Sequence, residues 1–398
     1  MRDLAVLLTG GSCLWWFLMK FSAILRTLWL FVLTRVLLVI VTYVGYILLN
    51  TPRDSTQAVK LEDMLMVWAR WDALNFLRIA QHGYQVPTDF AFFPFFPLLI
   101  ASISQYLGPW SYWLVGFMLS NLALFGTLLL LYQLAADIGG EKVACKAQLL
   151  FCIFPTSFYF FTAYNETLFL FFALGTLLAL RRHHWWTAGL LGCLAALTRS
   201  VGLMLVFPFL VELWLQKDRV AINKRTLFFC LLPMLLIPLG TALYSLYCWY
   251  STGDPIIFAT VQENWSRRSA WPWAGIASAI YDLIWEQPFG SFYQAHILLD
   301  LGATLSFLAL LLAGWRRIRL SYSIYNLILL LFCLVNPSLT HADPLISMQR
   351  LVLEEAPAFI TLGFLCIEHP RLDKALQVFF AALLVTLSMI FYMNSWMV

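Results

Sequence analysis

The chain has 398 residues, of which 62% are hydrophobic and only 12% are charged, with a formal net charge of +4. Soluble globular domains have about 25% charged residues, so this composition excludes that class. Backbone groups in lipid must be hydrogen-bonded within their own segment, and the sequence lacks the alternating ten-residue strands of a membrane barrel. We therefore expect an all-α polytopic membrane protein that forms one domain over residues 1–398, without a nucleic-acid partner.

About 20 apolar residues are needed to cross the hydrocarbon, and the sequence predicts about eleven spans. They are residues 27–49, 111–134, 146–162, 165–180, 186–198, 201–215, 226–250, 292–314, 321–336, 351–367 and 375–396. Two of them, 186–198 and 201–215, are short, so they form either two spans or one bent pair around Arg199.

Two further apolar stretches are not predicted to cross. Residues 4–19 are interrupted by Gly10-Gly11 and are not followed by a small-residue cleavage site, so we expect an interfacial arm. Residues 90–106 contain two prolines and end at Gly108-Pro109, which favours a half-helix dipping into the outer surface.

Positive charge sets the predicted orientation, because Lys and Arg gather in cytoplasmic loops. With the N-terminus inside, most of the 25 Lys and Arg residues fall in short inner loops. This orientation depends on residues 90–106 not being a crossing. It places on the outer face the loop 50–110, the turn 164–166, the loop 251–291 and the segment 337–350.

Asp72 is the strongest candidate for chemistry. Phe76, Ile79 and Ala80 follow it at helical spacing, which predicts an amphipathic helix on the membrane surface. A carboxylate near a low-dielectric boundary can be tuned to act as a general base. The competing interpretation is a structural ion pair with Arg70 or Arg78.

Two other outer acids carry similar alternatives. Asp89 precedes the run Phe90-Ala91-Phe92-Phe93-Pro94-Phe95-Phe96-Pro97 and is either a second carboxylate of the same cavity or a solvated loop residue. Asn165 and Glu166 sit between two apolar runs, where they either cap the following helix or contact substrate.

The remaining candidates are cations and aromatic residues. Arg199 lies in an apolar stretch, where an ionisable residue usually has a partner and a function; a phosphate and an acid such as Glu166 are the two choices. The outer residues have two possible roles. They either bind substrate, by stacking on a sugar or pairing with a phosphate, or anchor the protein at the membrane surface; these residues are Gln262, Trp265, Arg267, Arg268 and Arg350. His341 and Asp343 show no assignable pattern, and the six histidines lack zinc-site spacing, so no metal site is predicted.

Several of these segments resemble the PIG-V family, which comprises the GPI mannosyltransferase II proteins and their prokaryotic relatives. The first block is the most specific and contains Arg70-Trp71-Asp72-Ala73, Phe76, Ile79-Ala80 and Gly83-Tyr84, followed by the Phe-Pro run from Phe90 to Pro97. Shorter matches follow in family order over most of the chain. They are Ala163-Tyr164-Asn165-Glu166-Thr167-Leu168-Phe169, Thr198-Arg199-Ser200 with Gly202, Gln262 with Trp265, and Arg350 after Ser347.

The resemblance implies a GT-C-type fold whose active site lies on the non-cytosolic side. It implies transfer of a sugar, mannose in the characterised members, from a polyprenyl- or dolichyl-phosphate donor with inversion. Asp72 then matches the first-loop catalytic carboxylate, with Arg70 and Trp71 beside it. Glu166 matches the acid of a family motif in which Asn165 replaces the usual Ser. The implied partners are a glycolipid or glycan acceptor, membrane lipids and a small membrane subunit.

The compact outer loops favour a prokaryotic relative in the cell membrane; a eukaryotic chain would lie in the ER membrane. A divalent metal held by Asp72 and Glu166 stays an alternative to arginines at the donor phosphate. The rival functions are a transporter or lipid flippase, a non-catalytic partner of another transferase, and transfer of another sugar such as glucose or arabinose. A transporter would place its charges near the midplane, where only Arg35 and Asp300 are candidates.

Overall fold

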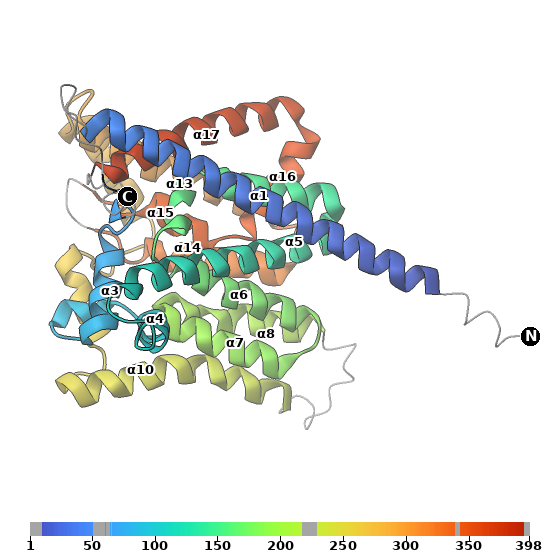
Figure 1. The fold of residues 1–398 in the computed structure, drawn as a ribbon, viewed down its shortest axis with the longest axis horizontal. Helices are drawn as coiled ribbons and strands as arrows, with labels where there is room; N and C mark the ends of the chain where they lie inside the picture. Colours follow the sequence, from blue (N-terminus) through green and yellow to red (C-terminus); the bar gives the residue numbers. More distant parts are fainter. Residues whose placement is uncertain are drawn as a thin grey trace, which may run out of the picture.

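The computed structural model describes residues 10–50, 60, 64, 66–216, 229–338 and 343–393. Within these residues the regular structure is helical, and the β pairing consists of one isolated bridge between Arg267 and Ser338. The expected all-α architecture is confirmed. Figure 1 shows most of the helices gathered into one bundle, from which α1 projects.

Most of the longer helices overlap the predicted spans, and three of them lie in the expected outer loops 50–110 and 251–291. In chain order they are α1 (Gly10–Asn50), α3 (Asp72–His82), α4 (Phe95–Ser104), α5 (Ser111–Ile153), α6 (Glu166–Arg181), α7 (Trp185–Thr198), α8 (Val206–Leu215), α10 (Leu236–Thr252), α12 (Ala274–Tyr281), α13 (Phe292–Gly314), α14 (Leu320–Leu334), α16 (Ala358–Glu368) and α17 (Pro370–Tyr392). Short helical turns join them: η1 (Pro87–Ala91), η2 (Ser157–Phe161), η3 (Ser200–Leu205), η4 (Leu232–Leu235), α11 (Ile257–Thr260), η5 (Val261–Trp265), η6 (Asp282–Glu286), α15 (Met348–Leu351) and η7 (Val352–Glu354).

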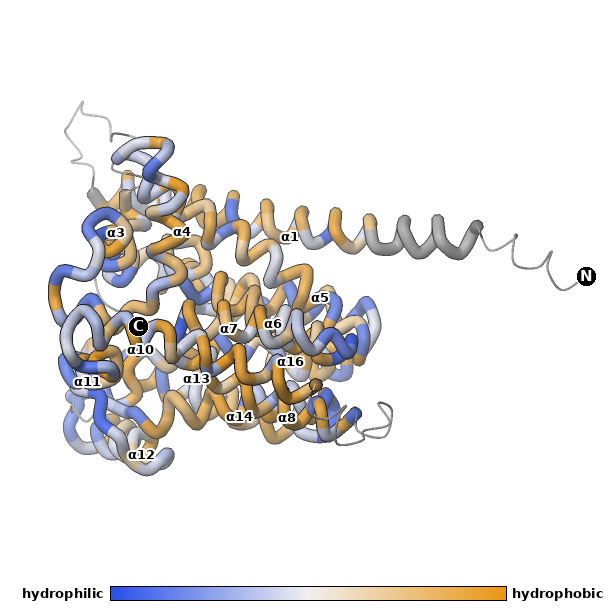
Figure 2. The backbone as a smooth tube through the Cα atoms, turned by 90° about the horizontal axis from the view of Figure 1, so that it is seen from below, coloured by the Kyte–Doolittle hydropathy of each residue, from blue (hydrophilic) through white to orange (hydrophobic). Residues whose placement is uncertain are grey.

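Helix length and composition support an integral membrane protein. Among the described residues, five helical segments are long and apolar enough to cross a membrane, and five further apolar helical segments have 10–17 residues. Figure 2 shows hydrophobic residues along the middle of the bundle and hydrophilic residues gathered toward its two ends. The expected number of eleven crossings stays a prediction.

Helix α5 is a hairpin of two helices. Gly140 has a φ of 74°, which glycine adopts without strain, and the chain reverses there. In consequence the Gln148 side-chain amide reaches back to donate to the Leu128 carbonyl at 2.8 Å. This turn confirms the separation of spans 111–134 and 146–162. The second arm, however, ends at Ile153, and η2 occupies the rest of the predicted span.

Helix α1 corrects one expectation and supports another. It runs unbroken from Gly10, so residues 10–19 are not a separate interfacial arm; residues 4–9 of that expected arm lie outside the described part. The helix packs on α5 and α17 and leaves an apolar surface that includes Trp29, Leu33 and Leu37 exposed. Such a surface fits contact with lipid tails.

The segment 90–106 does not cross the bundle. It forms η1 and then α4, which has ten residues and is therefore only about 15 Å long. Helix α4 packs beside α3 and the first part of α5, close to Gly116. The half-helix expectation is confirmed, although its depth relative to a membrane surface stays a prediction.

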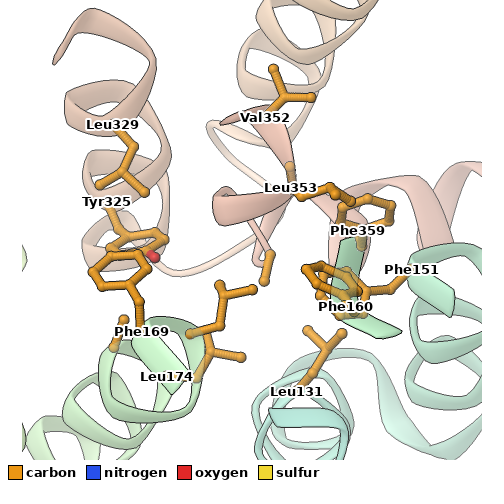
Figure 3. Packing of buried hydrophobic residues seen from close by; sticks show 14 of the residues in the cluster. Leu131, Phe151, Phe160, Phe169, Leu174, Tyr325, Leu329, Val352, Leu353 and Phe359 are labelled. Atoms are coloured by element: carbon orange, nitrogen blue, oxygen red, sulfur yellow. The ribbon is translucent and has the colours of Figure 1, made fainter. Parts of the chain in front are cut away.

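The core is organised around α6, whose residues are buried almost along their whole length. Figure 3 shows Phe169 and Leu174 of α6 beside Tyr325 of α14, and Phe151, Phe160 and Phe359 packed together. The Tyr325 hydroxyl donates to the Glu354 carbonyl at 2.9 Å. The core thus fixes the short turn η7 beneath the outer loops.

The two ends of the bundle carry different structures. At the hairpin end, where α5 reverses at Gly140, five ion pairs join neighbouring helix ends. They are Arg26–Glu141, Arg181–Asp137, Lys146–Asp373, Arg317–Glu368 and Arg319–Glu212. These basic residues were all expected in inner loops, and they do gather at one end; Lys217, Arg219, Lys224 and Arg225 lie outside the described residues. The loop end carries α3, α4, η5 and α15.

Candidate active site

A cavity of about 880 Å³ opens at the loop end. Segments far apart in the sequence line it: α3, the Phe-Pro run, the start of η3, η5 and α15. The predicted site residues among its lining are Asp72, Asn165, Arg199, Gln262, Trp265, Arg267, Arg268 and Arg350. The fold therefore brings most of the predicted set into one place.

Asp72 is the first residue of α3, and its partner lies almost at the other end of the chain. Its Oδ2 accepts a hydrogen bond from Nη2 of Arg350 at 2.9 Å. The expected pairing of Asp72 with Arg70 or Arg78 is therefore wrong, because Arg78 is paired with Asp89 instead. Helix α3 itself forms as predicted, with Phe76, Ile79 and Ala80 buried on one face.

Arg350 connects Asp72 with a second carboxylate. Its Nε lies 3.4 Å from Oε1 of Glu166, and its guanidinium carbon lies 5.4 Å from the ring centres of both Tyr159 and Tyr164. Burial disfavours the charged form of Arg350, but the two carboxylates outweigh this effect and raise its pKa. Arg350 therefore stays charged in a nearly closed environment.

Arg199 forms the other half of the network. Its Nη1 lies 2.9 Å from Oε1 of Glu166, and its Nη2 lies 2.7 Å from Oε1 of Glu354. The sequence left a phosphate and an acid as the two possible partners of Arg199, and the structure shows the acid. Burial opposes the charge on Arg199, yet Glu354 and Glu166 raise its pKa. Glu166 thus holds both arginines and is the middle residue of a chain of three carboxylates and two guanidiniums, Asp72–Arg350–Glu166–Arg199–Glu354.

Asn165 supports this network rather than capping α6. Its side chain makes no capping hydrogen bond; its Oδ1 accepts from Nη1 of Arg199 at 2.8 Å and its Nδ2 donates to the Thr198 carbonyl at 2.8 Å. The side-chain capping interpretation is therefore wrong for Asn165. Glu166 still lies in the first turn of α6, where an acid favours the helix dipole.

Close backbone packing sets the direction of Arg199. The Arg199 amide donates to the Ala195 carbonyl, and the Gly202 amide donates to the Arg199 carbonyl. A Cβ on Gly202 would lie 2.5 Å from backbone atoms of Ala195. Glycine is required here because the turn η3 folds directly back on the end of α7.

Three residues beside the cavity have left-handed backbones that are unusual for non-glycine residues. They are Trp71, Ser266 and Ser347, with φ values of 51°, 56° and 63°. They precede Asp72 and Arg267 directly, and Arg350 by three positions. Such conformations cost about 1–3 kcal/mol each and cluster at functional sites, where the surrounding structure holds them.

Four predicted site residues do not line the cavity, and one of them, Glu166, is joined to it through Arg199 and Arg350. Arg70 and Trp71 are absent from the residues that line the cavity, although the Arg70 carbonyl accepts from the Tyr164 hydroxyl at 3.2 Å. Asp89 is fully buried, paired with Arg78, and accepts from the amides of Gln85 and Val86. Asp89 is therefore neither a cavity carboxylate nor a solvated loop residue; it holds the turn before η1.

The outer loop 251–291 supplies one wall of the cavity. Arg267 is half-buried, and its Nη2 donates to the Ile346 carbonyl at 3.2 Å. Burial lowers the pKa of its guanidinium. The Trp265 ring lies 6.5 Å from that of Phe92, in an edge-on contact. Together with Phe76, Phe93 and Phe258, these rings make the adjoining wall apolar and aromatic.

Two groups of residues that the sequence patterns did not assign to a site come together in the structure. Glu354 lines the cavity and pairs with Arg199; two consecutive acids, Glu354-Glu355, inside an apolar stretch were the available signal. Burial raises the pKa of Glu354 to about 7, despite the opposing effect of Arg199. Behind the cavity, His296, Asp300 and Asp343 place potential metal-ligand atoms within 4.8 Å of one another.

The fold and the site define a membrane protein with an acid–arginine cavity at one end of an apolar helical bundle. The family model described as mannosyltransferase (PIG-V) matches residues 16–298. The match covers more than half of the chain, so the chain belongs to the PIG-V family. This membership agrees with the resemblance seen in the sequence.

Curated relatives agree with this assignment. GPI alpha-1,6-mannosyltransferase 2 of Cricetulus griseus is 30% identical over 271 residues, covering 59% of this chain and 54% of the relative. The Homo sapiens protein of the same name is 28% identical over 271 residues, with the same shares covered. The chain spans about half the length of these relatives.

Solved structures show a more distant likeness. The apo structure of ArnT from Cupriavidus metallidurans matches with 16% identity and a TM-score of 0.49, over 87% of this chain and 61% of that chain. An oligosaccharyltransferase of Archaeoglobus fulgidus, in its apo form, matches with 14% identity and a TM-score of 0.39, over 92% and 55% of the two chains.

Proposed function

We propose that this protein is a membrane mannosyltransferase that transfers mannose from a polyprenyl-phosphate donor to an acceptor hydroxyl with inversion. Family membership supports the reaction class. The observation that carries the mechanism is the placement of Asp72 on the cavity wall, joined through Arg350 to the buried Glu166. The acceptor is a glycolipid or another glycan.

Asp72 is the proposed general base. It takes the proton of the acceptor hydroxyl while that oxygen forms a bond to the anomeric carbon of the sugar. The bond from this carbon to the phosphate oxygen breaks, and the lipid phosphate leaves with the electron pair. Attack from the face opposite the leaving group inverts the anomeric centre. The bond from Arg350 fixes the carboxylate, so its orientation is set before the substrates arrive.

Arg267 and Arg268 are the proposed phosphate ligands. Arg199 and Arg350 each lie within ion-pair distance of two carboxylates, which already balance their charges. Arg267 instead donates to a neutral backbone carbonyl, and Arg268 lies beside it on the same wall. Within the described part of the chain neither arginine forms an ion pair, although Asp343 acts on Arg267 at longer range, and a guanidinium that forms no ion pair stabilises a leaving phosphate best. The aromatic wall of Phe76, Phe92 and Phe93 would hold the first isoprene units of the lipid.

A metal shared by Asp72 and Glu166 does not fit this arrangement. The guanidinium of Arg350 lies between the two carboxylates and contacts both. We therefore assign the charge balance at this point to Arg350 rather than to a divalent ion.

We place the cavity on the non-cytosolic face. The basic hairpin end carries the charges that typically remain in the cytosol. A lipid-linked donor suits the opposite face, because nucleotide sugars are cytosolic. The compact outer loops favour a cell membrane of a prokaryote, with the ER membrane as the eukaryotic equivalent.

Transfer of radiolabelled mannose from polyprenyl-phosphate mannose tests the proposal. Purified protein and a membrane lipid extract as acceptor should give a labelled product whose anomeric configuration is opposite to that of the donor. Arg267→Gln should raise the KM for the donor more than it lowers kcat, because phosphate binding is weakened in the ground state as well. A product with retained configuration would contradict the mechanism, and transfer only from a glucose or arabinose donor would contradict the sugar assignment.

A further inference from the structure

A second cluster of polar residues lies behind the cavity wall. His296 and Asp300 are four residues apart on α13, so their side chains occupy one face of the helix. Asp343 approaches them from the segment that leads into α15. One ligand atom from each residue lies within 4.8 Å of the other two. We propose that His296, Asp300 and Asp343 bind a divalent transition-metal ion that fastens this segment to α13.

The state of Asp300 is an independent reason to expect a ligand. Its side chain is fully buried, and Oδ1 accepts from the Gln349 amide at 2.8 Å. Its Oδ2 is also buried but receives no hydrogen bond within the described part of the chain, and Oδ1 of Asp343 shares this property. A buried carboxylate oxygen without a donor is costly. A cation between the two acids would remove this cost.

The distances suit a small metal ion. Nε2 of His296 lies 3.7 Å from Oδ2 of Asp300, and its Nδ1 lies 3.6 Å from Oδ1 of Asp343. Ligands about 2.0–2.1 Å from a tetrahedral Zn²⁺ lie about 3.3–3.4 Å apart, so an ion on one ring nitrogen reaches the carboxylate beside that nitrogen after a small contraction, while the other carboxylate must move further. One imidazole and two carboxylates are ligands that Zn²⁺ accepts, while Mn²⁺ is the natural alternative for carboxylates. Asp343 is partly exposed and offers a route for entry.

An imidazolium between two carboxylates is the competing arrangement, because one ring nitrogen faces each acid. Both nitrogen–oxygen distances, however, exceed the usual 2.7–3.2 Å of a hydrogen bond. A single metal ion would bind one of the two nitrogens and draw the carboxylate beside the other toward itself. The two arrangements differ in whether metal ions are bound, so the experiment below separates them.

The proposed ion would position Arg350 without touching the substrates. Asp300 already holds the amide of Gln349, the residue before Arg350. The segment between Asp343 and α15 also receives the hydrogen bond from Arg267 at Ile346. Fixing Asp343 would therefore steady both arginines of the cavity wall. Only this positioning role rests on the proposed function; metal binding does not.

Metal titration of the purified full-length protein in detergent tests the proposal. After treatment with EDTA and removal of the chelator, Zn²⁺ and then Mn²⁺ are added, and the bound ions are counted by mass spectrometry. We expect one ion per chain. His296→Gln and Asp343→Asn should each weaken binding by roughly tenfold or more, as expected for the loss of a ligand or its support. If His296→Gln does not fold, Asp343→Asn still tests the proposal, because it alters a loop residue and is expected to fold.

Asp72→Asn is the matched control, because it removes a carboxylate of the active site and leaves this cluster intact. It should retain the ion. Zn²⁺ should also raise the Tm of the wild type and leave that of Asp343→Asn unchanged. The proposal is overturned if the wild type binds no ion, or if Asp72→Asn loses the ion while Asp343→Asn keeps it. Neither result would affect the transfer assay, so failure of this proposal is distinguishable from failure of the proposed function.

Discussion

The two ends of the bundle use the same residue types for different purposes. At the hairpin end, five basic residues each pair with one acid, and in Arg317–Glu368 both side chains are at least 40% exposed. At the loop end, Arg199 and Arg350 share Glu166, whose side chain is 2% exposed. Exposed pairs contribute little to stability, whereas buried networks are costly to assemble and are retained for a reason beyond stability. Glu212 at the hairpin end is also buried, with its side chain 1% exposed, so the sharing of partners is what distinguishes the loop end.

We expect the largest effect when the activity of Asp72→Asn is compared with that of Asp373→Asn. Each variant removes the charge of one ion-paired acid, at the loop end and at the hairpin end respectively. Loss of a general base lowers a rate by about 100- to 10,000-fold, so Asp72→Asn should lower kcat by this amount in the transfer assay. Asp373→Asn should retain nearly full activity. Equal activities in the two variants would remove Asp72 from the mechanism.

The free energies of unfolding of Arg199→Met and Arg181→Met compare the stability contributed by an ion pair at each end. Removing Arg199 leaves Glu354 buried without its cation and leaves Glu166 with Arg350 alone, and stranding a buried charge in this way typically costs about 3–5 kcal/mol. Arg181 and Asp137 are partly exposed, and the loss of this pair should cost less than about 1 kcal/mol. Unfolding in detergent, followed by circular dichroism, measures both. Adding Glu354→Gln to Arg199→Met should recover part of the loss; if it does not, repulsion between the stranded acids is not the cause.

Gly202→Ala tests the close backbone contact that orients Arg199. The added methyl would overlap backbone atoms of Ala195, and overpacking of this kind costs about 1–3 kcal/mol. Gly302→Ala in α13 is the matched control, because a Cβ there meets nothing within 4 Å. It should be neutral or stabilising, since alanine favours helices. A Tm lowered equally in both variants would contradict the proposed contact.

Glu354 gives the smallest predicted effect, in the pH dependence of donor binding. Its pKa is raised from 4.5 to about 7, so the carboxyl is largely protonated below pH 7 and charged above it. The folded state therefore binds the proton more tightly than the unfolded chain, and stability from this group falls as the pH rises between these values. Protonation also releases Arg199 toward an anionic ligand. The donor Kd should fall by up to about tenfold from pH 8 to pH 6.

Glu354→Gln should flatten this dependence, because the amide does not titrate. The donor is a suitable probe, since its phosphodiester does not titrate in this range. Binding measured by fluorescence or calorimetry at both pH values decides the matter. An unchanged slope in Glu354→Gln would assign the pH dependence to another group.

The sequence determined the elements of this protein and most members of its cavity. Apolar length and periodicity are local properties, so the helices α6, α7, α13 and α17 lie close to the predicted spans. The helical spacing after Asp72 predicted the buried face of α3 for the same reason. Family motifs added Arg199, Gln262 and Arg350, all of which line the cavity.

Only the tertiary structure decided which charges meet. Asp72 and Arg350 are 278 positions apart, and their contact depends on how α3 and α15 pack on the bundle. The alternative interpretation, a pair between Asp72 and the nearby Arg70 or Arg78, is therefore not what the fold forms. The same applies to Asp89, which the fold buries against Arg78, and to Glu354, which it brings to Arg199. Electrostatic interactions depend on distance and burial in space, and neither quantity is fixed by spacing along the chain.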